Sequence, residues 1–391
     1  MKKRVPAERD EGRRGLAILG PAPPDRGGIA HETRLLAGEL SRRVPVDYVT
    51  FSRPYPGWLD PRRYSEDPGL PTSPALPLLD YRSPRTWTAA ARHIAGGDPF
   101  ALVVPWWTAF WGIPVGRVFR ELARLRPDAS RVLLCHNVED HEGAVWKRRL
   151  SRPAFASADA YVVHWQEGAR RLSADFPGRR VAVLPLPVPS GVPMERETAR
   201  AELGIPGDAP LLLFIGLIRP YKGVDVLLTA APRIVAETGA RIAIVGEVFR
   251  AARPLVRRWE KSPVRDRILW KDQYVPEEEM ALWLAAADAV VLPYTRISAS
   301  AIAARAVGAR RPIVASAVGG LRETVVPGVT GELFPVGDAD ALARAAGAVL
   351  SRGAGAYAPG LEAAAGRASW ESYAAGILDF VGSLRDGRSA S

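Results

Sequence analysis

The segment GLIRPYKGVD, residues 216–225, joins a short apolar run at 211–215 to an amphipathic stretch that begins at Val224. A short apolar run predicts a buried strand, and the longer period that follows predicts a helix. Main-chain N–H groups at such a helix start carry partial positive charge. Arg219 and Lys222 add two cations beside them. The segment therefore predicts an anion site suited to a diphosphate.

The same alternation of short apolar runs and amphipathic stretches continues in both directions from this segment. Such alternation is typical of α/β units with a parallel sheet. In the first half it predicts strands at 15–19, 46–49, 101–104, 132–135, 160–163 and 181–184, with a loop and insertion at 53–87. In the second half it predicts strands at 211–215, 241–245, 268–270, 289–292 and 312–315, and helices at 224–236, 277–287, 299–309 and 339–350.

The length of 391 residues predicts two domains, because single hydrophobic cores stop growing near about 250–300 residues. Residues 185–193 contain four prolines and predict a stiff connector. We therefore expect a disordered leader at 1–14, two doubly wound domains at 15–188 and 189–366, and a C-terminal helix at 367–391.

The net charge of +11 comes almost entirely from arginine, since only six of the 53 basic residues are lysine. Base composition of the gene and anionic partners are both open explanations of this surplus. The single cysteine excludes a disulfide framework, and Cys135 lies in an apolar run that predicts burial. The pair Asp338 and Asp340 precedes an alanine-rich helix and predicts a helix cap rather than a metal site.

No export signal or membrane span is predicted. The basic start of the chain leads into acidic residues instead of an apolar stretch, and the longest apolar run is far shorter than the roughly 20 residues of a spanning helix. We expect a cytoplasmic protein.

The motif Arg219-x-x-Lys222-Gly223 resembles the donor-diphosphate motif of retaining glycosyltransferases of family 4, the glycosyl transferases group 1. Residues 312–323 and 328–335 are similar to two further runs of that family's second domain. Residues 27–30 resemble its first glycine loop, residues 136–142 resemble the His-Asn-Val-x-x-His-Glu segment of a subgroup, and residues 370–371 match the start of its returning helix.

The resemblance implies a GT-B fold, in which two doubly wound Rossmann-like domains face a central cleft. It implies that 15–188 is the acceptor-side domain, that 189–366 binds the nucleotide sugar, and that the helix at 367–391 returns to the first domain. It implies a retaining transferase that moves a sugar from a nucleotide-diphosphate donor to a hydroxyl acceptor. No metal and no cofactor is expected, and the nucleotide sugar is a co-substrate.

The resemblance also implies roles for individual residues. His136, Arg219 and Lys222 would be catalytic, with the two cations holding the leaving diphosphate. His141 and Glu142 would contact the acceptor. The donor would be contacted by Gly27, Gly28, Tyr274, Val275, Ser300, Ala301, Ile302, Arg305 and Glu323.

One position departs from the family pattern. The family usually carries two glutamates eight positions apart, contacting the donor sugar and the ribose, and these fall near Ile297 and at Arg305 here. A guanidinium donates hydrogen bonds but accepts none, so the usual ribose contact is unavailable to Arg305. Arg305 would instead pair with phosphate, Glu323 or a modified donor, or mark a chain without turnover.

The alternatives are a non-catalytic GT-B paralogue that binds nucleotide or supports a partner enzyme, and another GT-B activity such as an epimerase or a phosphorylase. As acceptors we expect a sugar, a lipid-linked molecule or a small molecule. A lipid-linked acceptor would bring peripheral contact with the inner membrane face. Nothing in the chain resembles a nucleic-acid-binding module.

Overall fold

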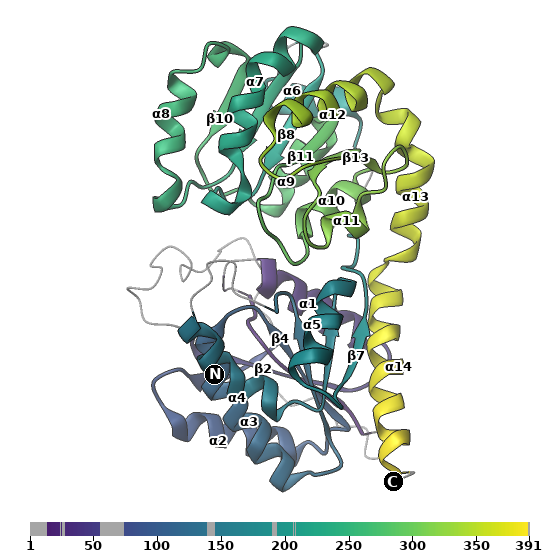
Figure 1. Ribbon diagram of the computed structural model, residues 1–391. Helices are drawn as coiled ribbons and strands as arrows, with labels where there is room; N and C mark the ends of the chain where they lie inside the picture. Colours follow the sequence, from purple (N-terminus) through teal and green to yellow (C-terminus); the bar gives the residue numbers. More distant parts are fainter. Residues whose placement is uncertain are drawn as a thin grey trace, which may run out of the picture. The chain divides into compact units, whose positions relative to one another are not determined.

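The computed structural model describes residues 14–389 apart from 24, 26–27, 55–73, 139–144, 190–193, 206 and 208. The chain forms two compact α/β units (Figure 1). The first unit comprises residues 1–163, 169–182 and 374–391, and the second comprises 164–168 and 183–373. The expected leader lies outside the described residues except for Arg14, whose guanidinium pairs with Asp98 and Asp128.

The first unit is built on a seven-stranded sheet of order β3-β2-β1-β4-β5-β6-β7. Its strands are β1 (Leu16–Leu19), β2 (Val46–Arg53), β3 (Leu76–Asp80), β4 (Ala101–Trp106), β5 (Ser130–Cys135), β6 (Ala160–Val163) and β7 (Arg180–Val183). Its helices are α1 (Gly28–Ser41), α2 (Pro84–Gly96), α3 (Gly112–Leu125), α4 (Val145–Ser157) and α5 (Gln166–Asp175), together with most of α14 (Trp370–Ser389).

The second unit is built on a six-stranded sheet of order β10-β9-β8-β11-β12-β13. Its strands are β8 (Leu211–Ile215), β9 (Arg241–Val245), β10 (Ile268–Lys271), β11 (Ala289–Leu292), β12 (Ile313–Ser316) and β13 (Gly331–Phe334). Its helices are α6 (Arg196–Glu202), α7 (Val224–Thr238), α8 (Pro254–Glu260), α9 (Glu277–Ala286), α10 (Ala301–Gly308), α11 (Leu321–Thr324), α12 (Ala339–Arg352) and α13 (Ala358–Arg367).

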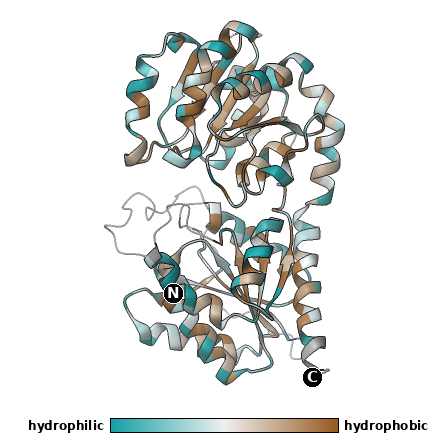
Figure 2. Ribbon diagram, in the orientation of Figure 1, coloured by the Kyte–Doolittle hydropathy of each residue, from teal (hydrophilic) through white to brown (hydrophobic). Residues whose placement is uncertain are grey.

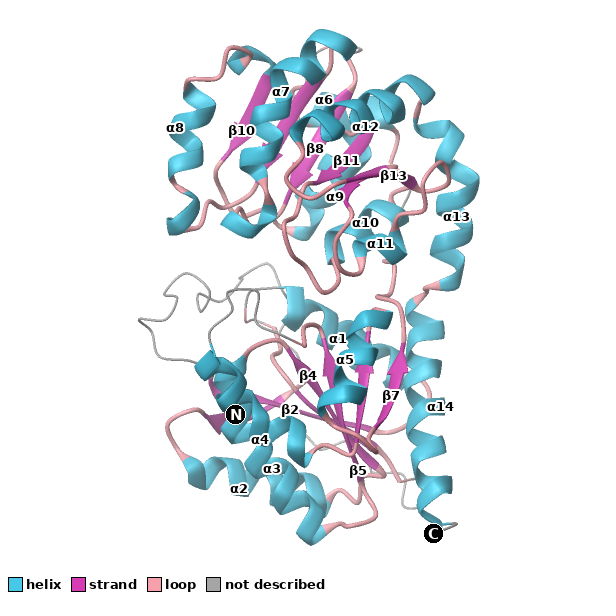
Figure 3. Ribbon diagram, in the orientation of Figure 1, coloured by secondary structure: helices cyan, strands magenta, loops and turns pink. Residues whose placement is uncertain are grey.

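Parallel pairing explains why the strands were predictable. Central strands of a parallel sheet are covered on both faces, so they are apolar throughout. Every residue of β8 is at most 1% exposed, and the strands form the hydrophobic centre of each unit in Figure 2. Figure 3 shows helices and loops around these sheets. All the strands predicted from the pattern are present within a few residues of their predicted bounds.

Strand β3 corrects the prediction of a loop and insertion across 53–87. It contains Pro77 and lies at the edge of the sheet, where a missing N–H costs no central ladder bond. Proline and partial exposure hide the strand pattern in the sequence.

The predicted cap at Asp338 is confirmed, because an Asp338 carboxylate oxygen accepts a 2.8 Å hydrogen bond from the N–H of Ala341.

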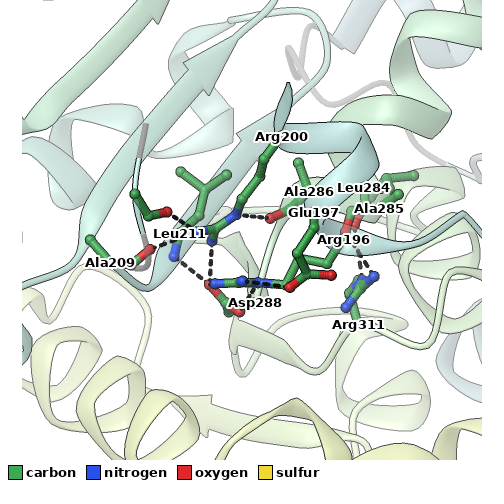
Figure 4. Close-up of polar contacts among 11 residues, drawn as sticks. Arg196, Glu197, Arg200, Ala209, Leu211, Leu284, Ala285, Ala286, Asp288 and Arg311 are labelled. Carbon is green, nitrogen blue, oxygen red and sulfur yellow. Dashed lines mark hydrogen bonds and ion pairs between the residues drawn. The ribbon is translucent and has the colours of Figure 1, made fainter. Parts of the chain in front are cut away.

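An arginine cluster braces the amino-terminal ends of β8 and β11, away from the loops that follow these strands (Figure 4). The Asp288 carboxylate accepts from the N–H of Leu211 at 2.6 Å and from Arg196 and Arg200 at 2.8 Å each. Arg200 also donates to three main-chain carbonyls, and Arg311 to two. Because these partners are all internal, the cluster holds α6 and α9 to the sheet.

His164 contacts Leu184 and Tyr373, two residues of the second unit that lie next to points where the chain crosses between the units. Its Nδ1 lies 3.0 Å from the carbonyl oxygen of Leu184, and its ring centroid lies 5.9 Å from that of Tyr373. Burial lowers the pKa of His164 to about 4, so the ring is neutral at physiological pH.

Gly223 is a position in the candidate loop where the fold leaves no room for a side chain. Its φ is +67°, and a Cβ there would lie 1.8 Å from the carbonyl oxygen of Pro293. Gly239 at the other end of α7 has φ +65° but no atom within 4 Å of such a Cβ. We expect Gly239→Ala to cost about 1 kcal/mol of unfolding free energy through backbone strain alone. Gly223→Ala should cost about 3 kcal/mol or more, because steric overlap adds to that strain. Urea unfolding of both variants measures the difference, and equal losses would contradict it.

His164 also generates a pH dependence. The unfolded chain binds a proton on this ring below about pH 6.5, whereas the folded chain does so only below about pH 4. The contribution to stability is therefore complete above pH 6.5 and is lost as the pH falls toward 4. We expect His164→Gln to flatten the decline of the urea midpoint across this window. The same decline in the variant and the parent protein would contradict this role.

Candidate functional site

The loop after β8 is held in one conformation by its neighbours in the second unit. The N–H of Ile218 donates to Glu247, and the N–H of Phe249 donates back to Ile218, so the loops after β8 and β9 run together. Gly223 then ends the short turn Pro220–Lys222 and caps α7. These contacts place residues 216–223 at the carboxyl edge of the sheet, where ligands bind in open α/β sheets.

Arg219 and Lys222 both rest on aromatic rings. The Arg219 guanidinium lies 4.4 Å from the ring centroid of Phe249, and the Lys222 Nζ lies 3.9 Å from that of Tyr294. Burial lowers the pKa of Lys222, and the nearby Arg219 charge adds to the lowering. A bound anion would relieve both effects, since an opposite charge favours the protonated amine.

The start of α10 lies at the same edge. The hydroxyl of Ser300 accepts a hydrogen bond from the N–H of Ala303 at 3.2 Å. The N–H groups of Ala301 and Ile302 lie in the same first turn, where a helix offers them no carbonyl partner. The Ile302 side chain is the nearest neighbour of Gly216, 3.6 Å from the position of a Cβ there. The loop cations and the α10 amino terminus therefore belong to one site.

A hydrogen bond joins the two loops directly. The N–H of Thr295 donates to the carbonyl oxygen of Tyr221 at 2.8 Å. Ser316 binds the carbonyl oxygen of Tyr294 from the end of β12, which anchors the second loop to the sheet.

Arg305 is nearly buried on α10 and forms an ion pair with Glu277. Its two nitrogens lie 2.6 and 3.3 Å from the two carboxylate oxygens. Glu277 starts α9, two residues after Val275, and its side chain is 41% exposed. The pair presents a partly exposed carboxylate next to the segment expected to contact the donor base.

Glu323 contacts Gln166, the first residue of α5, which groups with the second unit although most of this helix lies in the first. Both of its carboxylate oxygens accept from the N–H of Gln166, at 2.9 and 3.1 Å, at the amino terminus of α5. It therefore stabilises a helix start. Of the alternatives considered for Arg305, a pair with Glu323 is not formed, because Arg305 pairs with Glu277.

One residue predicted to be catalytic, His136, lies in the first unit. His136 follows β5, and its Nδ1 lies 3.5 Å from a carboxylate oxygen of Glu32 on α1, with both side chains largely buried. Gly28 is the first residue of that helix. Gly27, His141 and Glu142 lie outside the described residues.

Sequence reasoning missed four residues that complete these arrangements: Glu32, Phe249, Glu277 and Tyr294. Tyr294 carries a signal, since an aromatic residue directly after a buried strand lies at the ligand-binding edge of the sheet. The others are brought in by tertiary packing. Across the ranges that the structure describes, no group of three His, Cys, Asp or Glu side chains is arranged to hold a metal ion.

Residues 209–352 match the family model "Glycosyl transferases group 1". This range contains the whole second-unit site except Gln166. The chain is 32% identical over 285 residues to D-inositol 3-phosphate glycosyltransferase of Xylanimonas cellulosilytica, covering 69% of this chain and 66% of that protein. It is 34% identical over 273 residues to the enzyme of the same name from Geodermatophilus obscurus, covering 67% and 59%. The chain thus spans slightly less than two thirds of these relatives' lengths.

Solved structures share the fold at low sequence identity. Sucrose-phosphate synthase from Thermosynechococcus elongatus has a TM-score of 0.74 at 19% identity, over 97% of this chain and 100% of that one. Anabaena HepE in complex with UDP has a TM-score of 0.70 at 15% identity, over 94% and 100%. The fold is GT-B, and the chain belongs to the glycosyl transferases group 1 family.

Proposed function

We propose that the protein is a retaining glycosyltransferase that moves a sugar from a nucleotide-diphosphate donor to a hydroxyl acceptor. The observation that carries this proposal is the convergence of Arg219, Lys222 and the α10 amino terminus on one edge of the second-unit sheet. Three sources of positive charge at one place suit a diphosphate leaving group. A charge-assisted hydrogen bond contributes about 1.5–3 kcal/mol, so two cations would hold a diphosphate firmly.

In the proposed reaction the bond between the sugar's anomeric carbon and the diphosphate oxygen breaks, and the acceptor oxygen forms the new bond on the same face. The acceptor proton passes to an oxygen of the leaving phosphate. Arg219, Lys222 and the helix start would stabilise the charge that develops on the diphosphate, which is the charge that most limits such a reaction. No metal is needed for this stabilisation.

Donor contacts are proposed for the residues that surround this edge. The N–H groups of Ala301 and Ile302 would meet phosphate beside Ser300, and Tyr274 and Val275 would meet the base. The Glu277 carboxylate, held by Arg305, would accept from donor hydroxyl groups, which Arg305 itself cannot do. In the first unit we propose that His136, oriented by Glu32, contacts the donor sugar or the acceptor, with Gly28 near the donor.

Comparable proteins support a nucleotide-sugar donor. HepE is described in complex with UDP and with UDP-glucose. The named relatives act on an inositol phosphate, and for this chain we propose a hydroxyl acceptor on a sugar, a small molecule or a lipid. None of the helices that the structure describes combines the length and the apolar character of a membrane span. With a lipid-linked acceptor the protein would work as a peripheral protein at the inner membrane face.

A non-catalytic nucleotide-binding role is the second candidate. The pairing of Arg305 with Glu277 favours this role. In the family pattern a glutamate at the position of Arg305 accepts hydrogen bonds from the ribose hydroxyl groups, which an arginine cannot do.

A donor panel separates the two roles. Incubation with UDP-, GDP-, ADP- and TDP-sugars should give slow donor hydrolysis with one of them, followed by release of the nucleoside diphosphate. We expect the rate to survive EDTA, because the proposed charge stabilisation comes from side chains and a helix start. Binding of a nucleoside diphosphate without hydrolysis or transfer would favour the non-catalytic role, and loss of hydrolysis in EDTA would contradict metal independence.

Lys222→Ala tests the diphosphate assignment. We expect calorimetry to show at least about tenfold weaker binding of the nucleoside diphosphate, equal to about 1.4 kcal/mol. Lys261→Ala removes an exposed lysine at the end of α8 and is the matched control, with affinity expected to stay at the parent value. Unchanged affinity in Lys222→Ala would refute the role of this cation.

A further inference from the structure

The surplus positive charge is confined to one of the two units. The residues of the first unit contain 31 Lys and Arg against 21 Asp and Glu, and those of the second contain 22 against 21. The differences of +10 and +1 add up to the net charge of +11. A diphosphate site in the second unit therefore does not explain the surplus.

Helices α3 and α4 carry a concentrated part of this charge. They pack side by side on the sheet of the first unit (Figures 1 and 3). Their backbones approach closely, because a Cβ on Gly112 would lie 1.8 Å from the carbonyl oxygen of Leu150, and one on Gly116 would lie 2.6 Å from the carbonyl carbon of Pro153. Residue 112 is thus level with 150 and residue 116 with 153, so the helices run in the same direction.

Both helices present the same order of side chains to solvent. The second residue of each is a large exposed hydrophobic group, Ile113 at 45% and Trp146 at 59% exposure. Exposed arginines follow within the next turns of both helices. We define the α3–α4 surface as Ile113, Arg117, Arg120, Trp146, Arg148, Arg149 and Arg152.

Within the described residues of α3 and α4, acidic groups hardly offset this charge. Helix α4 contains no Asp or Glu, and α3 contains one, Glu121, which is 12% exposed and pairs with Arg124. Asp175 of α5 lies 3.7 Å from Arg148. Arg117, Arg120, Arg149 and Arg152 thus add positive charge beside two exposed apolar side chains.

We propose that the α3–α4 surface docks the protein on an anionic phospholipid bilayer. Trp146 and Ile113 would enter the interfacial layer, where tryptophan and aliphatic side chains are favoured, and the arginines would contact lipid phosphates. Exposed apolar groups at the tips of both helices favour a bilayer over a nucleic-acid duplex, whose recognition rests on cations and polar contacts to phosphate. This proposal goes beyond sugar transfer and does not depend on it, since none of these residues belongs to the donor site.

Sedimentation with vesicles tests the proposal. The full chain should bind vesicles of equimolar phosphatidylcholine and phosphatidylglycerol, and pure phosphatidylcholine vesicles at least about tenfold more weakly. Arg148→Glu with Arg149→Glu should lower binding to the anionic vesicles at least about tenfold. Arg257→Glu with Arg258→Glu on α8 replaces an equivalent exposed Arg-Arg pair in the second unit and should leave binding unchanged. Circular dichroism and urea unfolding confirm that each variant is folded.

A second variant isolates the apolar part. Trp146→Ser with Ile113→Ser should weaken vesicle binding severalfold while leaving its salt dependence in place, because the arginines remain. Equal binding to neutral and anionic vesicles, equal loss in both arginine pairs, or tight binding to duplex DNA without vesicle binding would each overturn the proposal. Failure of sugar transfer in the donor panel would leave the vesicle result unaffected, so the two proposals fail separately.

Discussion

The left-handed backbone at Gly223 is the constraint on which the second-unit site depends. With φ at +67° and the Pro293 carbonyl where a side chain would begin, only glycine fits between the loop after β8 and the loop after β11. The contact brings Lys222 over Tyr294 and lets Tyr221 accept from Thr295. Two loops separated by about seventy residues thus become one surface, and α10 starts from it.

The same packing explains why the cations are poised for an anion. Aromatic rings supply a weak attraction to Arg219 and Lys222 but replace the water that would otherwise solvate them. The lowered pKa of Lys222 reports this loss of solvation. In contrast, Arg200 and Arg311 are buried among carbonyls and Asp288, which satisfy them internally. Arginines of one chain therefore differ in their surroundings: Arg219 lies against an aromatic ring, whereas Arg200 and Arg311 lie against main-chain carbonyls.

Most of the fold could be predicted from the sequence, because parallel strands buried on both faces are apolar throughout. β3 could not, since an edge strand tolerates Pro77 and exposure. In the site, the loop of Arg219 and Lys222 was predictable because strand, loop and helix are contiguous in the chain. Glu277 and Glu32 were not, because Arg305 and His136 meet them only through tertiary packing. The roles of all the site residues remain predictions, and Gly27, His141 and Glu142 lie outside the described ranges.

Helix α14 begins in the second unit and ends in the first, where Ala374, Ile377, Val381 and Leu384 are buried and Ser383 accepts a hydrogen bond from Arg180. The first unit is therefore discontinuous in the chain. Although most of it precedes the second unit in the chain, its apolar surface beneath α14 stays uncovered until the residues from Ala374 onward have been synthesised. During synthesis the order of completion is thus the reverse of the order along the chain, and the second unit can close its core first.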